Sequence, residues 1–121
     1  MRATLTIAAL VAVGGAACLP AQAFAGTDLD WVSCQLYDSV HKKVVHPNSS
    51  FSKEAGVDAG AMYVKFLASA KDQGKIDATS KAGGACTISS NVDDANNKTW
   101  RFVLLMKSIG AQEESITFVG D

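Results

Sequence analysis

Two cysteines constrain this chain more than any other feature of its sequence. The chain has 3, and Cys18 falls in an N-terminal apolar run with the pattern of a cleaved signal, which leaves Cys34 and Cys86. Two cysteines in a small exported domain most simply form one disulfide. A bridge closing a loop of this length stabilises a fold by about 4 kcal/mol on the chain-entropy estimate. A catalytic redox pair usually has Cys-x-x-Cys spacing, so we predict a structural Cys34–Cys86 disulfide.

Residues 1–25 have the pattern of a signal peptide. Arg2 supplies a positive start, and the apolar run LTIAALVAVGGAACL follows. The run is shorter than the ~20 apolar residues that a membrane span needs. Ala23 and Ala25 form a small-x-small cleavage site, and Ala21 and Ala23 repeat this pattern two positions earlier. We expect cleavage after residue 25, with residue 23 as the alternative, and export to the periplasm or the cell exterior.

Cys18 raises a second interpretation, a lipid-modified chain anchored to a membrane. Lipidation sites usually carry a leucine-like residue three positions before the cysteine, and that position is Gly15 here. A good cleavage site also lies downstream of Cys18. We therefore expect Cys18 to be discarded with the signal peptide.

Residues 26–121 are enough for one domain with one modest core. In the whole chain, 11 basic residues nearly balance 12 acidic ones. A dedicated nucleic-acid-binding protein needs a basic face, and attachment to anionic membranes needs a polybasic segment. The composition therefore argues against a nucleic-acid partner and against membrane attachment of the mature domain.

The hydrophobic pattern predicts a ββαβαβ order. Period-two alternation indicates strands, and apolar spacings of three and four indicate helices. Pro47 ends the second strand, because proline cannot donate a hydrogen bond to a sheet ladder. Loops are expected around residues 48–57 and over 75–84. In the second loop, Gly83 and Gly84 are interpreted as turn residues. The predicted strands are 31–38, 43–46, 85–89 and 115–119, and the predicted helices are 58–74 and 90–110.

These elements predict a small α+β domain. Two amphipathic helices need a common surface on which to bury their apolar stripes, and a sheet provides it. We expect a four-stranded, mostly antiparallel sheet with both helices packed on one face. The disulfide should bring the first and third strands together, because bridged Cα atoms lie within ~7 Å.

Asp38, His41 and His46 form the one nominal set of metal ligands, and the chain holds only 2 histidines. Imidazole and carboxylate groups bind zinc and copper. His41 should lie near a turn and His46 along the returning strand, while Lys42 and Lys43 would repel a cation. These three residues are the candidate metal ligands, but the repulsion and the spacing lead us to expect no metal and no other cofactor.

The sequence lacks the Gly-x-Ser-x-Gly elbow of serine hydrolases, so we predict no enzyme activity. The favoured interpretation is a non-catalytic binding domain for a protein or small molecule whose identity the sequence does not specify. The alternative is a compact exported hydrolase, or a metal-binding protein, that uses His41 or His46. A close histidine–carboxylate pair inside a concave pocket would favour the enzyme.

The predicted interaction surface combines two regions. Pro47, Asn48 and Phe51 belong to the polar loop after the second strand, and Trp100 lies on the second helix. The apolar surface of that helix is wider than one buried stripe requires, which leaves Trp100 available to a partner.

Overall fold

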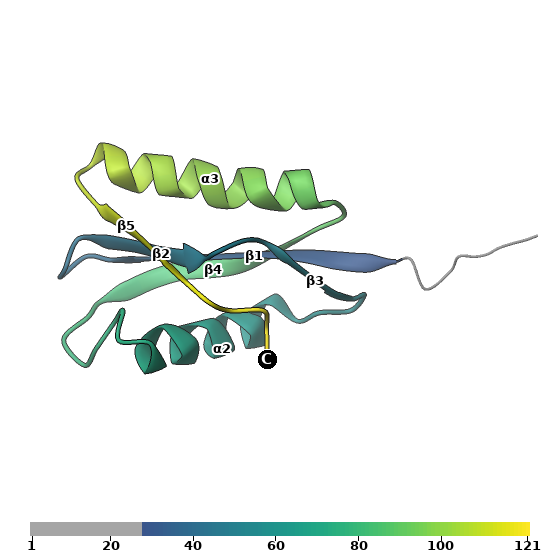
Figure 1. Ribbon diagram of the computed structural model, residues 1–121, viewed down its shortest axis with the longest axis horizontal. Coiled ribbons are helices and arrows are strands. Elements are labelled where there is room, and N and C mark those ends of the chain that lie inside the picture. The colour runs from purple at the N-terminus through teal and green to yellow at the C-terminus, as the bar shows by residue number, and fades with distance from the viewer. Residues whose placement is uncertain (1–27) are drawn as a thin grey trace, which may run out of the picture.

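The computed structural model describes residues 28–121 as one sheet with two helices (Figure 1). The predicted signal peptide, with Cys18, Ala23 and Ala25, lies outside the described residues. The strands are β1 (Leu29–Asp38), β2 (Lys43–Pro47), β3 (Phe51–Glu54), β4 (Ala82–Ser89) and β5 (Gln112–Ile116), and the helices are α2 (Ala59–Asp72) and α3 (Val92–Ser108). The α+β class and the mostly antiparallel sheet are confirmed.

Strand β1 organises the sheet. It pairs antiparallel with β4 along one side, and with β3 and β2 along the other. Strand β5 then adds to β2 in parallel. Cys34 lies directly opposite Cys86 in the β1–β4 pair, and the two form the predicted disulfide across a sequence separation of 52.

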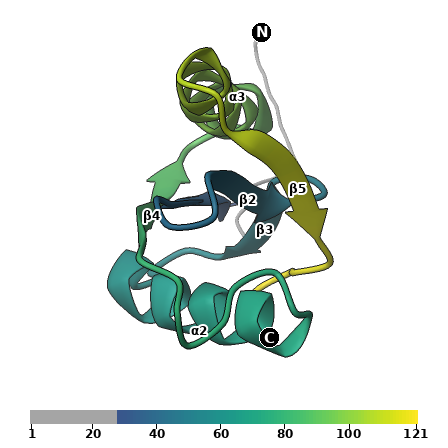
Figure 2. The ribbon, with the colours of Figure 1, turned by 90° about the vertical axis from the view of Figure 1, so that its left-hand side faces the viewer.

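The two helices lie on opposite faces of the sheet, and the end-on view shows three layers (Figure 2). The prediction that both helices share one face was wrong. Strand β1 is buried on both sides: Val32, Cys34 and Leu36 pack in the cluster that includes α2. Ser33 and Gln35 face α3, and they are buried as well. A strand of small or apolar residues can be covered on both faces, because its side chains alternate between them.

The sheet has a fifth strand where a loop was expected. Residues 51–54 form β3, which pairs with the start of β1. Phe51 is only 7% exposed and packs edge-to-face on Phe118, with ring centroids 5.4 Å apart. Burial of this aromatic side chain holds the segment against β1, so the structure removes Phe51 from the predicted interaction surface.

Strand β4 begins earlier than predicted and includes both glycines of the expected loop. A Cβ atom on Gly84 would lie 2.1 Å from the carbonyl oxygen of Gln35, whereas one on Gly83 would meet nothing within 4 Å. Gly84 therefore does not form a turn. Its lack of a side chain lets β4 approach β1 closely at this position.

The ends of the helices follow local chemistry. Asp58 accepts hydrogen bonds from the backbone N–H groups of Gly60 and Ala61, so α2 begins where the sequence predicted. The second helix was expected from residue 90, and α3 is instead capped at Asn91, whose side chain accepts from the N–H group of Asp94 at 2.8 Å. Within residues 28–121, neither helix is long and apolar enough to cross a membrane.

The last strand also differs from the prediction. Strand β5 starts at Gln112 and ends at Ile116, whereas residues 115–119 were expected. Its parallel pairing with β2 sets this register. Phe118 then leaves the sheet and packs into the core beneath α2.

Candidate functional site

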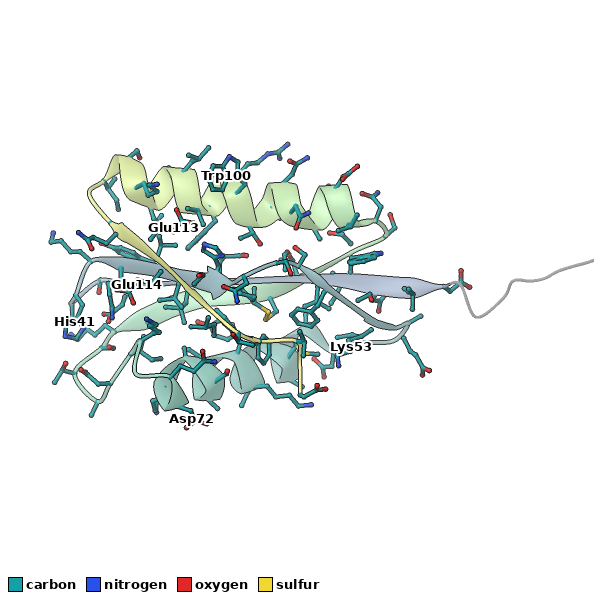
Figure 3. The ribbon with its side chains drawn as sticks, viewed as in Figure 1. His41, Lys53, Asp72, Trp100, Glu113 and Glu114 are labelled. Atoms are coloured by element: carbon teal, nitrogen blue, oxygen red, sulfur yellow. A yellow bond between two sulfur atoms is a disulfide. The ribbon has the colours of Figure 1, made fainter. Side chains whose placement is uncertain are left out.

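A cleft of about 520 Å³ lies between the first half of α3 and the sheet. Its volume falls within the range of small-molecule sites. Figure 3 shows Trp100 on α3 and Glu113 on β5, on the same side of the sheet. The lining comprises Ser33 and Cys34 of β1, His46 and Pro47 of β2, loop residues 48–50, Asn96, Asn97, Thr99 and Trp100 of α3, and Glu113 of β5.

Short polar side chains on the floor explain why a cleft exists here. The hydroxyl groups of Ser33 and Thr87 are hydrogen-bonded at 2.7 Å, and Thr99 donates to Gln35 at 3.4 Å. The apolar cluster that seats α3 on the sheet, built around Val103, lies at the other end of the helix. The first half of α3 is therefore held above small side chains that do not fill the space below it.

His46 and Glu113 form a tight pair at one wall of the cleft. Nε2 of His46 lies 2.7 Å from Oε2 of Glu113, and Nδ1 lies 2.6 Å from the carbonyl oxygen of Pro47. Nδ1 donates to the Pro47 carbonyl oxygen, because a carbonyl oxygen can only accept a hydrogen bond. The hydrogen bond from His46 holds the pKa of the Glu113 carboxyl below its usual range despite partial burial, and Lys107 adds to this effect.

This arrangement limits what the pair can do chemically. A general base needs a nitrogen lone pair within reach of the proton that it removes. Both nitrogens of His46 are already directed at protein oxygens, and the imidazole is only 13% exposed. The pair links β2 to β5 at one wall of the cleft.

A second histidine–carboxylate pair lies at the turn end of the sheet, where Figure 3 shows His41. Nδ1 of His41 is 2.7 Å from Oδ2 of the fully buried Asp38. Asp38 also accepts the backbone N–H groups of Val40, His41 and Lys81. Burial alone would raise the pKa of the Asp38 carboxyl, but hydrogen bonds from Ser80, His41 and Lys81 outweigh it and hold the pKa well below its usual range.

Asp38 and His41 connect the β1–β2 turn to the loop before β4. Nε2 of His41 is 3.3 Å from the Thr79 hydroxyl, which gives the outline of a carboxylate–histidine–hydroxyl chain. However, Thr79 donates its hydroxyl proton to Asp77, so it is not offered to His41 as an activated nucleophile would be. The geometry is that of a hydrogen-bonded turn.

The structure separates the three nominal metal ligands. Asp38 and His41 lie together at the turn, whereas His46 pairs with Glu113 in the cleft. Across residues 28–121, no group of three or more His, Cys, Asp or Glu side chains is placed to hold a metal ion.

The predicted surface residues come together in part. Pro47, Asn48 and Trp100 all line the cleft, although β2 and α3 are far apart in the sequence. The sequence analysis did not include Asn96 and Asn97 among the surface residues. They lie four and three residues before Trp100, which puts all three side chains on one side of the helix. Glu113 precedes the predicted last strand, 115–119, and nothing local in the sequence connects it with His46.

A second hollow, of about 490 Å³, lies beside α2 and the C-terminal residues. Most of its charged groups already have partners: Lys53 pairs with Asp121 at 3.0 Å, and Lys65 reaches the carbonyl oxygen of Gly120, whereas Glu54 is the exception. Asp58 is occupied as the N-cap of α2. This hollow therefore offers fewer free groups than the cleft beneath α3.

Comparison with known proteins adds no assignment: no family model matches the chain, and neither a curated protein nor a solved structure matches it.

Proposed function

We propose that this chain is an exported, non-catalytic binding domain whose ligand occupies the cleft between α3 and the sheet. The cleft itself carries the proposal, because its walls hold groups that have no structural task. The indole of Trp100 is 51% exposed at the cleft. Within the described part of the chain, the side-chain amides of Asn96 and Asn97 make no hydrogen bond to another residue.

Export rests on two independent features. Residues 1–25 have the order of a signal peptide, a positive start, an apolar run and a small-x-small site. The Cys34–Cys86 disulfide belongs to a class of bond that persists in oxidising compartments such as the periplasm or the cell exterior. Together they support an extracytoplasmic site of action.

The non-catalytic part of the proposal rests on the two histidines. His46 has both ring nitrogens directed at protein oxygens, and His41 is held by Asp38 next to a hydroxyl whose proton belongs to Asp77. Neither is arranged as a base with an activated nucleophile. The hydrolase alternative keeps one supporting observation, which is that the His46–Glu113 pair lies inside a cleft.

The test is a binding screen on ¹⁵N-labelled protein purified from an exporting host with its disulfide intact. A mixed panel of saccharides, short peptides and nucleosides is added while amide resonances are followed. We expect saturable shifts at residues 46–50 and 96–100, which the Trp100→Ala variant should weaken. Leu105→Ala is the matched control, because Leu105 is exposed on the same helix and does not line the cleft.

Two outcomes would contradict the proposal. Shifts confined to the hollow beside α2, or no shifts with any compound, would remove the cleft as the binding site. A ligand consumed during the titration, detected by mass spectrometry, would establish the hydrolase instead.

A further inference from the structure

The charge and hydrogen-bonding character of the cleft specifies a class of ligand. We propose that the cleft binds a neutral, hydroxyl-rich molecule, a saccharide, with one sugar ring stacked on Trp100. This inference rests on the proposed binding function. It depends in addition on the charge of the cleft, its hydrogen-bonding side chains and the indole of Trp100.

The cleft offers no unbalanced charge. Among residues 28–121, Glu113 is the only carboxylate that lines it, and its Oε2 lies 2.7 Å from Nε2 of His46. The second oxygen of Glu113 is occupied by Lys107 at 3.3 Å. Phosphate and carboxylate ligands are held by charge-assisted bonds from Arg or Lys, and no Arg or Lys in the described part of the chain lines this cleft. A neutral ligand follows from this balance.

The remaining wall groups match sugar hydroxyls. Each amide of Asn96 and Asn97 provides a donor and an acceptor, and a sugar hydroxyl can both donate and accept. The hydroxyl oxygen of Ser50 is buried and has no hydrogen-bond partner within residues 28–121. Buried polar atoms are nearly always paired, so a ligand hydroxyl that reaches Ser50 would complete its hydrogen bonding.

Trp100 supplies the flat apolar surface that a sugar ring needs. The face of an indole carries partial negative charge and attracts the partly positive C–H groups of a pyranose ring. Asn96 and Asn97 lie on the same side of α3, one turn before Trp100. One helix side therefore combines stacking with hydrogen bonding at the ring edge.

A peptide fits these walls less well. Peptide ligands are anchored either by pairing with an open strand edge or by apolar side chains in pockets. Of the strands that line the cleft, β1 and β2 are already paired on both sides, and β5 alone keeps an open edge. Apart from Trp100 and Pro47, few of the wall side chains are apolar.

The experiment titrates the purified, disulfide-bonded protein with defined probes and follows the Trp100 indole and the amides of Asn96 and Asn97. The neutral probes are N-acetylglucosamine oligomers, cellobiose, maltotriose and trehalose. The contrasting probes are glucose 6-phosphate, glucuronic acid and a set of tripeptides. We expect at least one neutral saccharide to shift these resonances saturably. Its affinity should fall at least tenfold in Trp100→Ala, fall less in Trp100→Phe, and stay unchanged in Leu104→Ala.

The outcomes separate this inference from the proposed function. If tripeptides or the charged sugars shift the cleft resonances and no neutral saccharide does, the ligand class is wrong and the binding function stands. If no probe of any class shifts them, the inference and the proposed function both fail. Neutral binding that persists unchanged in Trp100→Ala would overturn the stacking arrangement.

Discussion

The two faces of the sheet differ in what fills them, although β1 contributes to both. The face beneath α2 holds a cluster of 12 buried residues, in which Phe66 and Phe118 lie 5.5 Å apart. The face beneath α3 has only Val44, Val103 and Ala111 in its buried apolar cluster. Apolar burial stabilises a fold in proportion to the area removed from water, so the α2 face carries most of the stability and the α3 face leaves room for a cleft.

The largest expected effect tests this difference directly. Phe66→Ala, in the fully buried centre of the α2 face, should lower the free energy of unfolding by about 3–5 kcal/mol. Val103→Ala, at an equally buried position of α3, removes two methyl groups and should cost about 1–2 kcal/mol. Chemical denaturation of both variants measures the contrast. Equal losses would show that the two faces contribute alike.

The acid sensitivity of the fold should depend on a carboxylate of the α2 face. Asp38 has a pKa held below its unfolded value, so its contribution is present above about pH 4 and is lost as pH falls through that region. Asp38→Asn should cost about 1.5–3 kcal/mol at neutral pH, because charged hydrogen bonds are lost. It should also flatten the fall in stability on the acid side.

Glu113→Gln is the matched variant for Asp38→Asn. The pKa of Glu113 is lowered by His46, but its side chain is 30% exposed beside the cleft, so solvent screens its contribution. Unfolding free energies between about pH 2 and pH 7 should therefore change less in this variant. A larger change in Glu113→Gln than in Asp38→Asn would reverse the assignment.

Substitutions at two adjacent glycines test the close approach of β4 to β1. This strand pair lies in the sheet on which both helices pack. Gly84→Ala would drive its Cβ into the Gln35 carbonyl, and we expect a loss of about 1–3 kcal/mol as strands shift. Gly83→Ala has open space around its Cβ and should be neutral or slightly stabilising. Thermal and chemical denaturation of the pair measure the difference. Equal effects would show that β4 adjusts freely against β1.

The smallest effect concerns the cleft itself. Asn97→Ala alters an exposed helix position and should change the free energy of unfolding by no more than about 0.5 kcal/mol. Val103→Ala, on the same helix, serves as the comparison for a residue that supports the fold. A substantial loss of stability in Asn97→Ala would assign this residue a structural task and weaken its place in a binding site.

The elements were predictable where local chemistry decides them. The alternation of residues 31–38 indicated β1, and the N-cap carboxylate of Asp58 marked the start of α2. The candidate site was predictable only in part. Trp100 was expected to be exposed because its helix has more apolar surface than one buried stripe needs. Pro47 and Asn48 were expected at the interaction surface because they belong to the polar loop after a strand.

The sequence by itself determined the disulfide, both helices and most of the strands, because cysteine number, capping and side-chain period act over short distances. Tertiary structure alone decided that the helices cover opposite faces, that Phe51 is buried and that β2, α3 and β5 enclose a cleft. Alternation shows which side chains of β1 share a face, but it does not say which helix will cover that face. The His46–Glu113 contact joins residues at a sequence separation of 67, and only the packed chain brings them together.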